Sequence, residues 1–155
     1  MHINPDHFLE TPEGRVTTRE RNAWAWQQCH AALPGALAAG DPAGPLYVMV
    51  GAQGSGKTTW ARERQRLEPG CTIFDAILVK RSERAPLLAA ARALGVPAVA
   101  VWIRTPLEIC LARNAARPPD EIADEAGLRN VFAALEPPTV GEGFARVWEV
   151  GAHGG

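Results

Sequence analysis

The chain has 155 residues, a formal net charge of −1, and 46% hydrophobic and 21% charged residues. This length suits one domain with a real core and is too short for two ordinary domains. The near-zero charge excludes an overall positive field that would hold nucleic acid, so a polyanion would need a local group of arginines. There is no apolar run of membrane-spanning length and no secretory pattern in "MHINPDHFLE", so we expect a cytoplasmic protein without a membrane segment. The three cysteines (Cys29, Cys71 and Cys110) form no C-x-x-C pair and indicate reduced core thiols.

The N-terminal part of the chain predicts a short extended segment followed by one helix. The stretch "HINPDHF", residues 2–8, has the character of a short strand that Pro5 interrupts. Thr17 and Glu20 form a capping-box pattern that opens a helix through "RNAWAWQQCHAAL". The Pro34-Gly35 pair is expected to end or kink this helix, and "GDPAGP", residues 40–45, is expected to be a loop.

From residue 46 onward, apolar strands alternate with helices. Thr105, Pro106 and Glu108 have the pattern of a helix cap, a first-turn proline and a capping box. Continuous apolar runs are typical of strands that are buried on both faces of a parallel sheet, and their alternation with helices indicates a three-layer α/β domain. We expect strands at residues 46–50, 71–76, 98–103 and 144–150, and helices at 57–68, 82–95, 107–117 and 120–135.

The stretch "GAQGSGKT", residues 51–58, matches G-x-x-x-x-G-K-[ST] between a predicted strand and a predicted helix. Its glycines allow backbone N–H groups to turn toward phosphate oxygens, at the positive end of the following helix. Lys57 would neutralise the β- and γ-phosphates, and the Thr58 hydroxyl would bind Mg²⁺. The predicted ligands are therefore ATP and Mg²⁺, with Gly51, Gln53, Gly54, Ser55, Gly56, Lys57, Thr58 and Thr59 as the residues on the nucleotide.

Asp75 follows the apolar run "CTIF", in a strand that should lie beside the phosphate loop. An aspartate at this position can hold the Mg²⁺ shell as the second acid of a P-loop enzyme. The alternative is that Asp75 caps the turn that follows the strand.

Two pairs of arginines are candidates for contact with anions. Arg113 and Arg117 are four positions apart, so they would share one face of a helix that overhangs the phosphates. As arginines of a lid they would meet the charge on the transferring phosphoryl group, whereas the alternative is a solvated helix face. Arg81 and Arg84, after the Asp75 strand, could reach an anionic substrate.

From Val48 to Val150, these residues resemble the kinase domain of polynucleotide 5′-hydroxyl kinases and their P-loop kinase relatives. The resemblance rests on "IFDAILVKRSERAPLLAAARALGVP", "RTPLEICLARNAAR" and the tail "VFAALEPPTVGEGFARVWEV". It implies a P-loop NTPase fold of the kinase type with a mostly parallel sheet of about five strands. It also implies an ATP·Mg²⁺-dependent phosphotransferase in which Arg113 and Arg117 are the lid arginines.

The order of the segments departs from that family. There, an aspartate that acts as general base lies between the P-loop helix and the strand of the second acid, usually with an arginine three residues later. Here only "WARERQRLEPG" separates Thr59 from Cys71, and a stretch similar to the missing part stands at the N-terminus. That stretch equally resembles the zeta-toxin kinases. Asp6 would be the displaced base, with Leu9 in place of the arginine.

We therefore predict a single P-loop kinase-like domain over residues 1–155 with a rearranged strand order. Residues 1–40 would carry the base and the acceptor site, and residues 46–150 the nucleotide-binding core and lid. If this is right, residues 2–5 should pair beside the Asp75 strand, with Asp6 facing the same cleft as Lys57.

The sequence leaves several functions open. A phosphotransferase would move the γ-phosphate of ATP to a polynucleotide 5′-hydroxyl, a nucleotide sugar or a small metabolite. The net charge does not favour a nucleic-acid end. An ATP-binding module without transferase activity is the second hypothesis. A motor ATPase is poorly supported because the chain has little room for a sensor subdomain.

Overall fold

A computed structural model describes residues 1–39 and 44–151, so residues 40–43 of the predicted loop at 40–45 lie outside the described part. A five-stranded sheet has the order β1-β5-β4-β6-β7, and every neighbouring pair in it is parallel. The predicted mostly parallel sheet is therefore confirmed. Its strands are β1 (His2–Ile3), β4 (Leu46–Val50), β5 (Thr72–Phe74), β6 (Ala98–Ile103) and β7 (Arg146–Val150).

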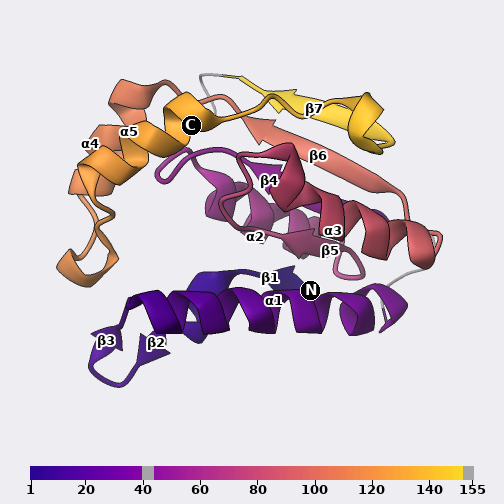
Figure 1. The fold of residues 1–155 in the computed structure, drawn as a ribbon, viewed down its shortest axis with the longest axis horizontal. Coiled ribbons are helices and arrows are strands. Elements are labelled where there is room, and N and C mark those ends of the chain that lie inside the picture. The colour runs from indigo at the N-terminus through magenta and orange to yellow at the C-terminus, as the bar shows by residue number, and fades with distance from the viewer. Residues whose placement is uncertain (40–43, 152–155) are drawn as a thin grey trace.

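Helices cover both faces of this sheet (Figure 1). Alternate residues of a strand point to opposite faces, so Val48 of β4 belongs to one core cluster and Met49 to another. The Val48 cluster packs under α1 (Arg19–Ala39) and α3 (Arg81–Ala93), and the Met49 cluster under α2 (Lys57–Leu67). The domain thus has the three predicted layers.

Two further helices pack against each other and against the phosphate loop. These are α4 (Leu107–Ala115) and α5 (Glu125–Ala134), and a small core of Ala52, Cys110 and Leu128 joins them to the loop. They lie together at one end of the sheet in Figure 1. The remaining elements are the 3-10 turns η1 (Pro5–Phe8), η2 (Pro119–Glu121) and η3 (Val140–Glu142), and a hairpin of β2 (Glu10–Thr11) and β3 (Gly14–Arg15) that the sequence did not predict.

The N-terminal strand lies at the edge of the sheet beside β5, ahead of the P-loop strand in the chain. His2 is in register with Ile73, and the backbone N–H of Asp75 donates to the carbonyl of Ile3 over 2.7 Å. The strand is shorter than the predicted 2–5 because the Asn4 side chain accepts from the Asp6 N–H and begins η1. The N-terminal strand therefore pairs beside the Asp75 strand, as predicted.

The Pro34-Gly35 pair was expected to end or kink α1, and the helix does not end there but reaches Ala39. Proline removes one helical hydrogen bond, but Leu33 and Leu37 on either side of it are both buried in the core. Tertiary packing therefore carries the helix through the proline. The N-terminal cap is Thr18, whose hydroxyl accepts from the Arg21 N–H, rather than the predicted Thr17.

The helices near the phosphate loop also begin and end differently from the prediction. Thr105 does not cap α4, because its buried hydroxyl donates to the carbonyl of Ser55 over 2.6 Å. Helix α5 begins only at Glu125, where the Asp124 side chain accepts from the Gly127 N–H. Within the described ranges, no helix combines the length and apolarity needed to cross a membrane.

Candidate functional site: a phosphate loop and an adjoining cleft

The backbone of the glycine-rich loop lies close against the backbone of α4. Gly54 has a φ of +77°, and a Cβ on it would lie 2.6 Å from the carbonyl oxygen of Cys110. Gly56 has a φ of 105° and directly precedes α2. Both positions favour glycine because a side chain there would be strained. Glycine at these two positions therefore allows the loop to close onto α4 and to lead directly into α2.

Lys57 points into this loop. Its side chain is buried, and Nζ donates to the carbonyl of Ala52 over 2.9 Å. Burial lowers the pKa of Lys57, and the nearby Asp75 carboxylate opposes that effect. An enclosed ammonium group with so few polar neighbours is costly unless it gains an anion. The loop is thus suited to an anionic ligand.

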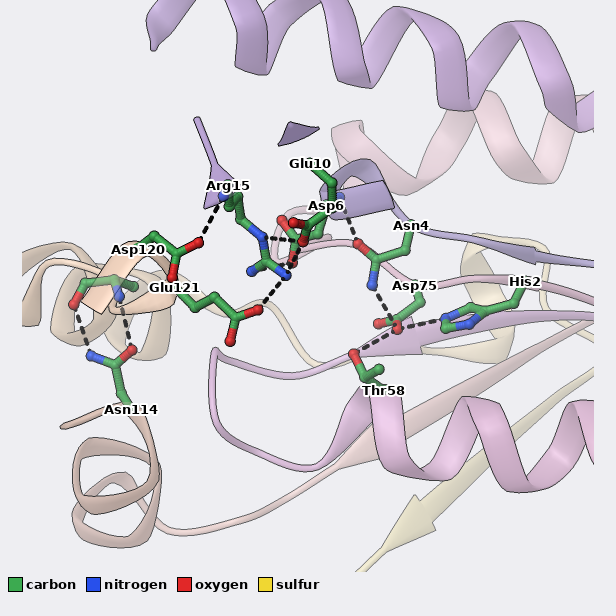
Figure 2. A network of polar contacts seen from close by, with 11 residues as sticks. His2, Asn4, Asp6, Glu10, Arg15, Thr58, Asp75, Asn114, Asp120 and Glu121 are labelled. Carbon is green, nitrogen blue, oxygen red and sulfur yellow. Dashed lines mark hydrogen bonds and ion pairs between the residues drawn. The ribbon is translucent and has the colours of Figure 1, made fainter. Parts of the chain in front are cut away.

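Asp75 is the centre of a buried hydrogen-bond network (Figure 2). Its Oδ2 atom accepts from the Thr58 hydroxyl at 2.9 Å and from the Asn4 amide at 3.0 Å, and it lies 2.8 Å from Nε2 of His2. Burial alone would raise the pKa of Asp75, but the hydrogen bond from His2 and the charge of Lys57 outweigh it and hold that pKa below its ordinary value. The group is therefore a carboxylate, and the N-terminal strand helps to fix it. In the alternative role Asp75 would cap the turn that follows the strand, but its side chain contacts His2, Asn4 and Thr58 instead.

The donor set fits Mg²⁺. A hydroxyl and a carboxylate supply oxygen ligands, and Mg²⁺ usually takes only one or two protein groups together with substrate phosphates and water. Among residues 1–39 and 44–151, there is no group of three or more potential metal-binding side chains that would suit a metal held by protein alone. The Ser55 hydroxyl is enclosed in the loop and forms no hydrogen bond with the described residues, which fits a loop whose polar groups are completed by a ligand.

A cleft of about 450 Å³ opens beside the loop. It brings together residues that are far apart in the sequence, from the N-terminal segment, the phosphate loop, the segment after β5 and the segment after α4. Asp6 of η1 lines the same cleft as Lys57, and its carboxylate lies 3.5 Å from the guanidinium of Arg15. The predicted site residues that line it are Asp6, Gln53, Lys57, Thr58, Asp75 and Arg117.

Arg113 and Arg117 do not share a helix face, so that part of the prediction is wrong. Helix α4 ends at Ala115, and Arg117 lies beyond it at the wall of the cleft. Arg113 instead donates to the carbonyl oxygens of Gly54 at 3.3 Å and Ser55 at 3.4 Å. One arginine therefore contacts the backbone of the loop and the other faces the cleft. Thr59, also predicted on the nucleotide, is exposed outside the residues that line the cleft.

The expectation that Arg84 reaches an anionic substrate is also wrong. Its side chain is 0% exposed and forms two 2.9 Å contacts with the Glu142 carboxylate. It also donates to the carbonyls of Leu78, Val79 and Glu136. Arg84 thus ties α3 to the segment that leads into β7. Arg81 lies exposed at the start of α3.

Arg15 is a site residue that the sequence did not reveal. Its guanidinium lies 3.0 Å from Glu10, 2.9 Å from Glu121 and 3.5 Å from Asp6, and its backbone N–H donates to Asp120 over 2.7 Å. Figure 2 shows its side chain reaching from β3 toward Asp6 and Glu121. No motif marks it, because only the folded hairpin brings it to Asp6. Leu9, at the place of the family's arginine, is buried.

Comparisons with known proteins agree with this fold. A family model described as an AAA domain matches residues 63–138, which lie after the phosphate loop. The solved structure of Kti12 from Chaetomium thermophilum, in complex with ADP-AlF3, is similar with a TM-score of 0.59 and 15% identity. That match covers 70% of this chain and 90% of the Kti12 chain. Among curated proteins nothing matches.

Identity at this level supports the fold alone. The structural similarity agrees with the parallel sheet, the glycine-rich loop and the Thr58–Asp75 hydrogen bond of this chain. The chain is a three-layer α/β protein with the kinase-like fold of P-loop NTPases.

Proposed function

We propose that the protein is an ATP-dependent phosphotransferase that moves the γ-phosphate to a hydroxyl acceptor. The observation that carries this proposal is the continuity of one cleft, which joins Lys57, Thr58 and Asp75 to the separate carboxylate of Asp6. A protein that only binds ATP needs the first three groups and has no use for the fourth. A solved neighbour of the same fold, Kti12, held ADP-AlF3, which supports a nucleotide in this kind of loop.

The phosphate half of the site would bind and orient ATP. The loop N–H groups and the Lys57 ammonium would hold the β- and γ-phosphates. Thr58 and Asp75 would hold Mg²⁺, which neutralises charge on the phosphates when it is bound. Arg117, at the wall of the same cleft, would stabilise charge on the γ-phosphoryl oxygens in the transition state.

The acceptor half would supply a base. The acceptor oxygen forms a bond to the γ-phosphorus as the bond to the bridging β-γ oxygen breaks, and ADP leaves. The hydroxyl proton would pass to a carboxylate, and we assign that role to Asp6 because it lines the same cleft as Lys57 and Thr58 of the phosphate loop. Arg15 contacts the Asp6 carboxylate and would hold its orientation.

One alternative is supported by a specific observation. The Asp6 side chain is 47% exposed and is paired with Arg15, as an ordinary surface aspartate could be. In that case the protein would bind ATP without transferring phosphate.

Two measurements separate these functions. Calorimetric titration with ATP and Mg²⁺ should show binding by the parent protein and a large loss in Lys57→Ala, with Arg66→Ala on the exposed face of α2 as the matched control. A screen of hydroxyl compounds with γ-labelled ATP should then yield a labelled product. ATP binding without any labelled product would favour the binding module, and unchanged binding in Lys57→Ala would remove the loop from the site.

A further inference from the structure

Beyond the phosphate loop, most of the charged side chains that line the cleft are carboxylates. Asp75 and Lys57 belong to the phosphate half, and the rest of the charged lining divides unequally. The cations are Arg15 and Arg117, and the carboxylates are Asp6, Asp120, Glu121 and Asp124.

Arg15 adds little positive potential for a ligand, because acidic side chains already surround it. Its guanidinium contacts Asp6, Glu10 and Glu121, and the side chain itself is only 16% exposed. Three carboxylates around one guanidinium leave a local excess of negative charge. Arg117 is the remaining cation of the lining, and it lies in the same cleft as the phosphate loop.

The contacts of Arg15 also form one boundary of the cleft. They join β3 to η2, and the Asp120 side chain fits closely against Gly14, where a Cβ would lie 2.8 Å from its Oδ2 atom. Figure 2 shows these contacts between the hairpin and η2, close to Asp6. A polynucleotide needs a row of lysines and arginines for its phosphates, whereas this boundary of the cleft presents carboxylates.

An aromatic side chain completes the lining. Trp26 of α1 lines the cleft and is fixed by contacts with His30, at 5.8 Å between ring centroids, and with Phe74, at 6.5 Å. Tryptophan is the aromatic residue best suited to a cationic group, and its apolar surface also suits a sugar ring or an alkyl chain. Asn22, one helical turn earlier, adds an uncharged hydrogen-bonding group.

We propose that the acceptor is a small hydroxyl compound that carries an ammonium group, such as an amino alcohol or an amino sugar. Its ammonium would lie among Asp120, Glu121 and Asp124, and its hydroxyl would face Asp6 and the γ-phosphate. The hydrogen bonds described above use only one carboxylate oxygen of each of these three residues, so the other oxygen would face the ammonium group. This inference rests on the proposed phosphotransferase function and names the class of its acceptor.

The first test compares matched acceptors with γ-labelled ATP: glucosamine against glucose, ethanolamine against ethylene glycol, and a 5′-hydroxyl oligonucleotide. The ammonium member of each pair should show the higher kcat/KM as acceptor. Equal labelling within the pairs, no labelling of either member, or preference for the oligonucleotide would overturn the inference. Labelled oligonucleotide would still support a phosphotransferase, and absence of ATP binding in calorimetry would mark failure of the proposed function itself.

The second test uses Asp124→Asn, which removes the charge but keeps a good helix N-cap. The KM for the ammonium acceptor should rise about five- to tenfold, while the KM for ATP stays unchanged, because one close charge pair is lost. Glu125→Gln is the matched control, since Glu125 lies next in the chain and pairs with Arg129 on the surface. Equal KM values for the ammonium acceptor in Asp124→Asn and Glu125→Gln would overturn the inference.

Discussion

The imidazole of His2 lies 2.8 Å from Oδ2 of Asp75, and this contact joins the first residues of the chain to the acid beside the phosphate loop. The Thr58 hydroxyl donates to the same oxygen. A residue 73 positions away from Asp75 thus helps to orient the acid that we propose for Mg²⁺. The N-terminal strand is part of the site as well as of the sheet.

Asp75→Asn should lower turnover far more than it lowers stability. An asparagine keeps the shape and one carbonyl oxygen for the hydrogen bonds from Thr58 and Asn4, but it removes the charge that Mg²⁺ needs. Steady-state kinetics over a range of Mg²⁺ concentrations, with a thermal melt of the same sample, would check this. Unchanged activity per folded molecule, together with a large loss of melting temperature, would assign Asp75 a structural role only.

Arg117→Ala should reduce kcat with little change in ATP affinity, because Arg117 lines the cleft in which charge would develop during the proposed transfer. Loss of a preorganised donor costs about 2–4 kcal/mol of barrier. Arg113→Ala should instead weaken ATP binding, since Arg113 donates to carbonyls of the phosphate loop. Separate measurement of kcat and of ATP affinity distinguishes the two variants. The same pattern in both would contradict the different positions that the structure gives them.

Arg84→Ala should destabilise the fold by about 3–5 kcal/mol, because it leaves the buried Glu142 carboxylate and several carbonyls without their donor. Chemical denaturation gives the free energy of unfolding. Arg81→Ala, on the exposed start of the same helix, is the matched control and should stay within about 0.5 kcal/mol of the parent. A loss of activity in Arg84→Ala at unchanged stability would return Arg84 to a substrate role.

Much of the fold could be predicted because its signals are local. The apolar strand Leu46–Val50 and the glycine-rich phosphate loop can each be recognised from a short run of neighbouring residues. The parallel sheet then follows from the alternation of strands and helices. The residues of "HINPDHF" predicted a short strand, but its place beside the Asp75 strand was predicted only through the resemblance, since His2–Ile3 is too short to show its position by periodicity.

The errors arise where tertiary contacts decide. Pro34 was expected to end or kink the helix, and packing of Leu33 and Leu37 rules out the end because it carries α1 onward. Arg84 was predicted to reach an anionic substrate, but in the structure it pairs with Glu142, which lies 58 positions away in the sequence. Arg15 has no local signature at all. Spacing along the chain does not show which charges meet after folding.

The three cysteines should resist alkylation in the native protein. Cys29, Cys71 and Cys110 are buried and unbridged in the structure. Burial raises the pKa of Cys29 to about 12, so its thiol stays protonated at pH 8 and lacks the reactive thiolate. Iodoacetamide followed by intact mass measurement should add nothing to the native protein and three groups after denaturation. Native labelling at Cys29 would contradict its burial.

Asp6→Asn tests the base and therefore the phosphotransferase proposal. Asparagine cannot accept the hydroxyl proton, so kcat should fall by about a hundredfold or more while ATP affinity stays unchanged. The side chain is half exposed, so the variant should fold as the parent does. Glu10→Gln is the matched control: Glu10 also pairs with Arg15, but it is not among the residues that line the cleft. Parent-like transfer by Asp6→Asn would remove Asp6 from the chemistry, and an equal loss in Glu10→Gln would show that the orientation of Arg15, rather than a base at Asp6, limits the rate.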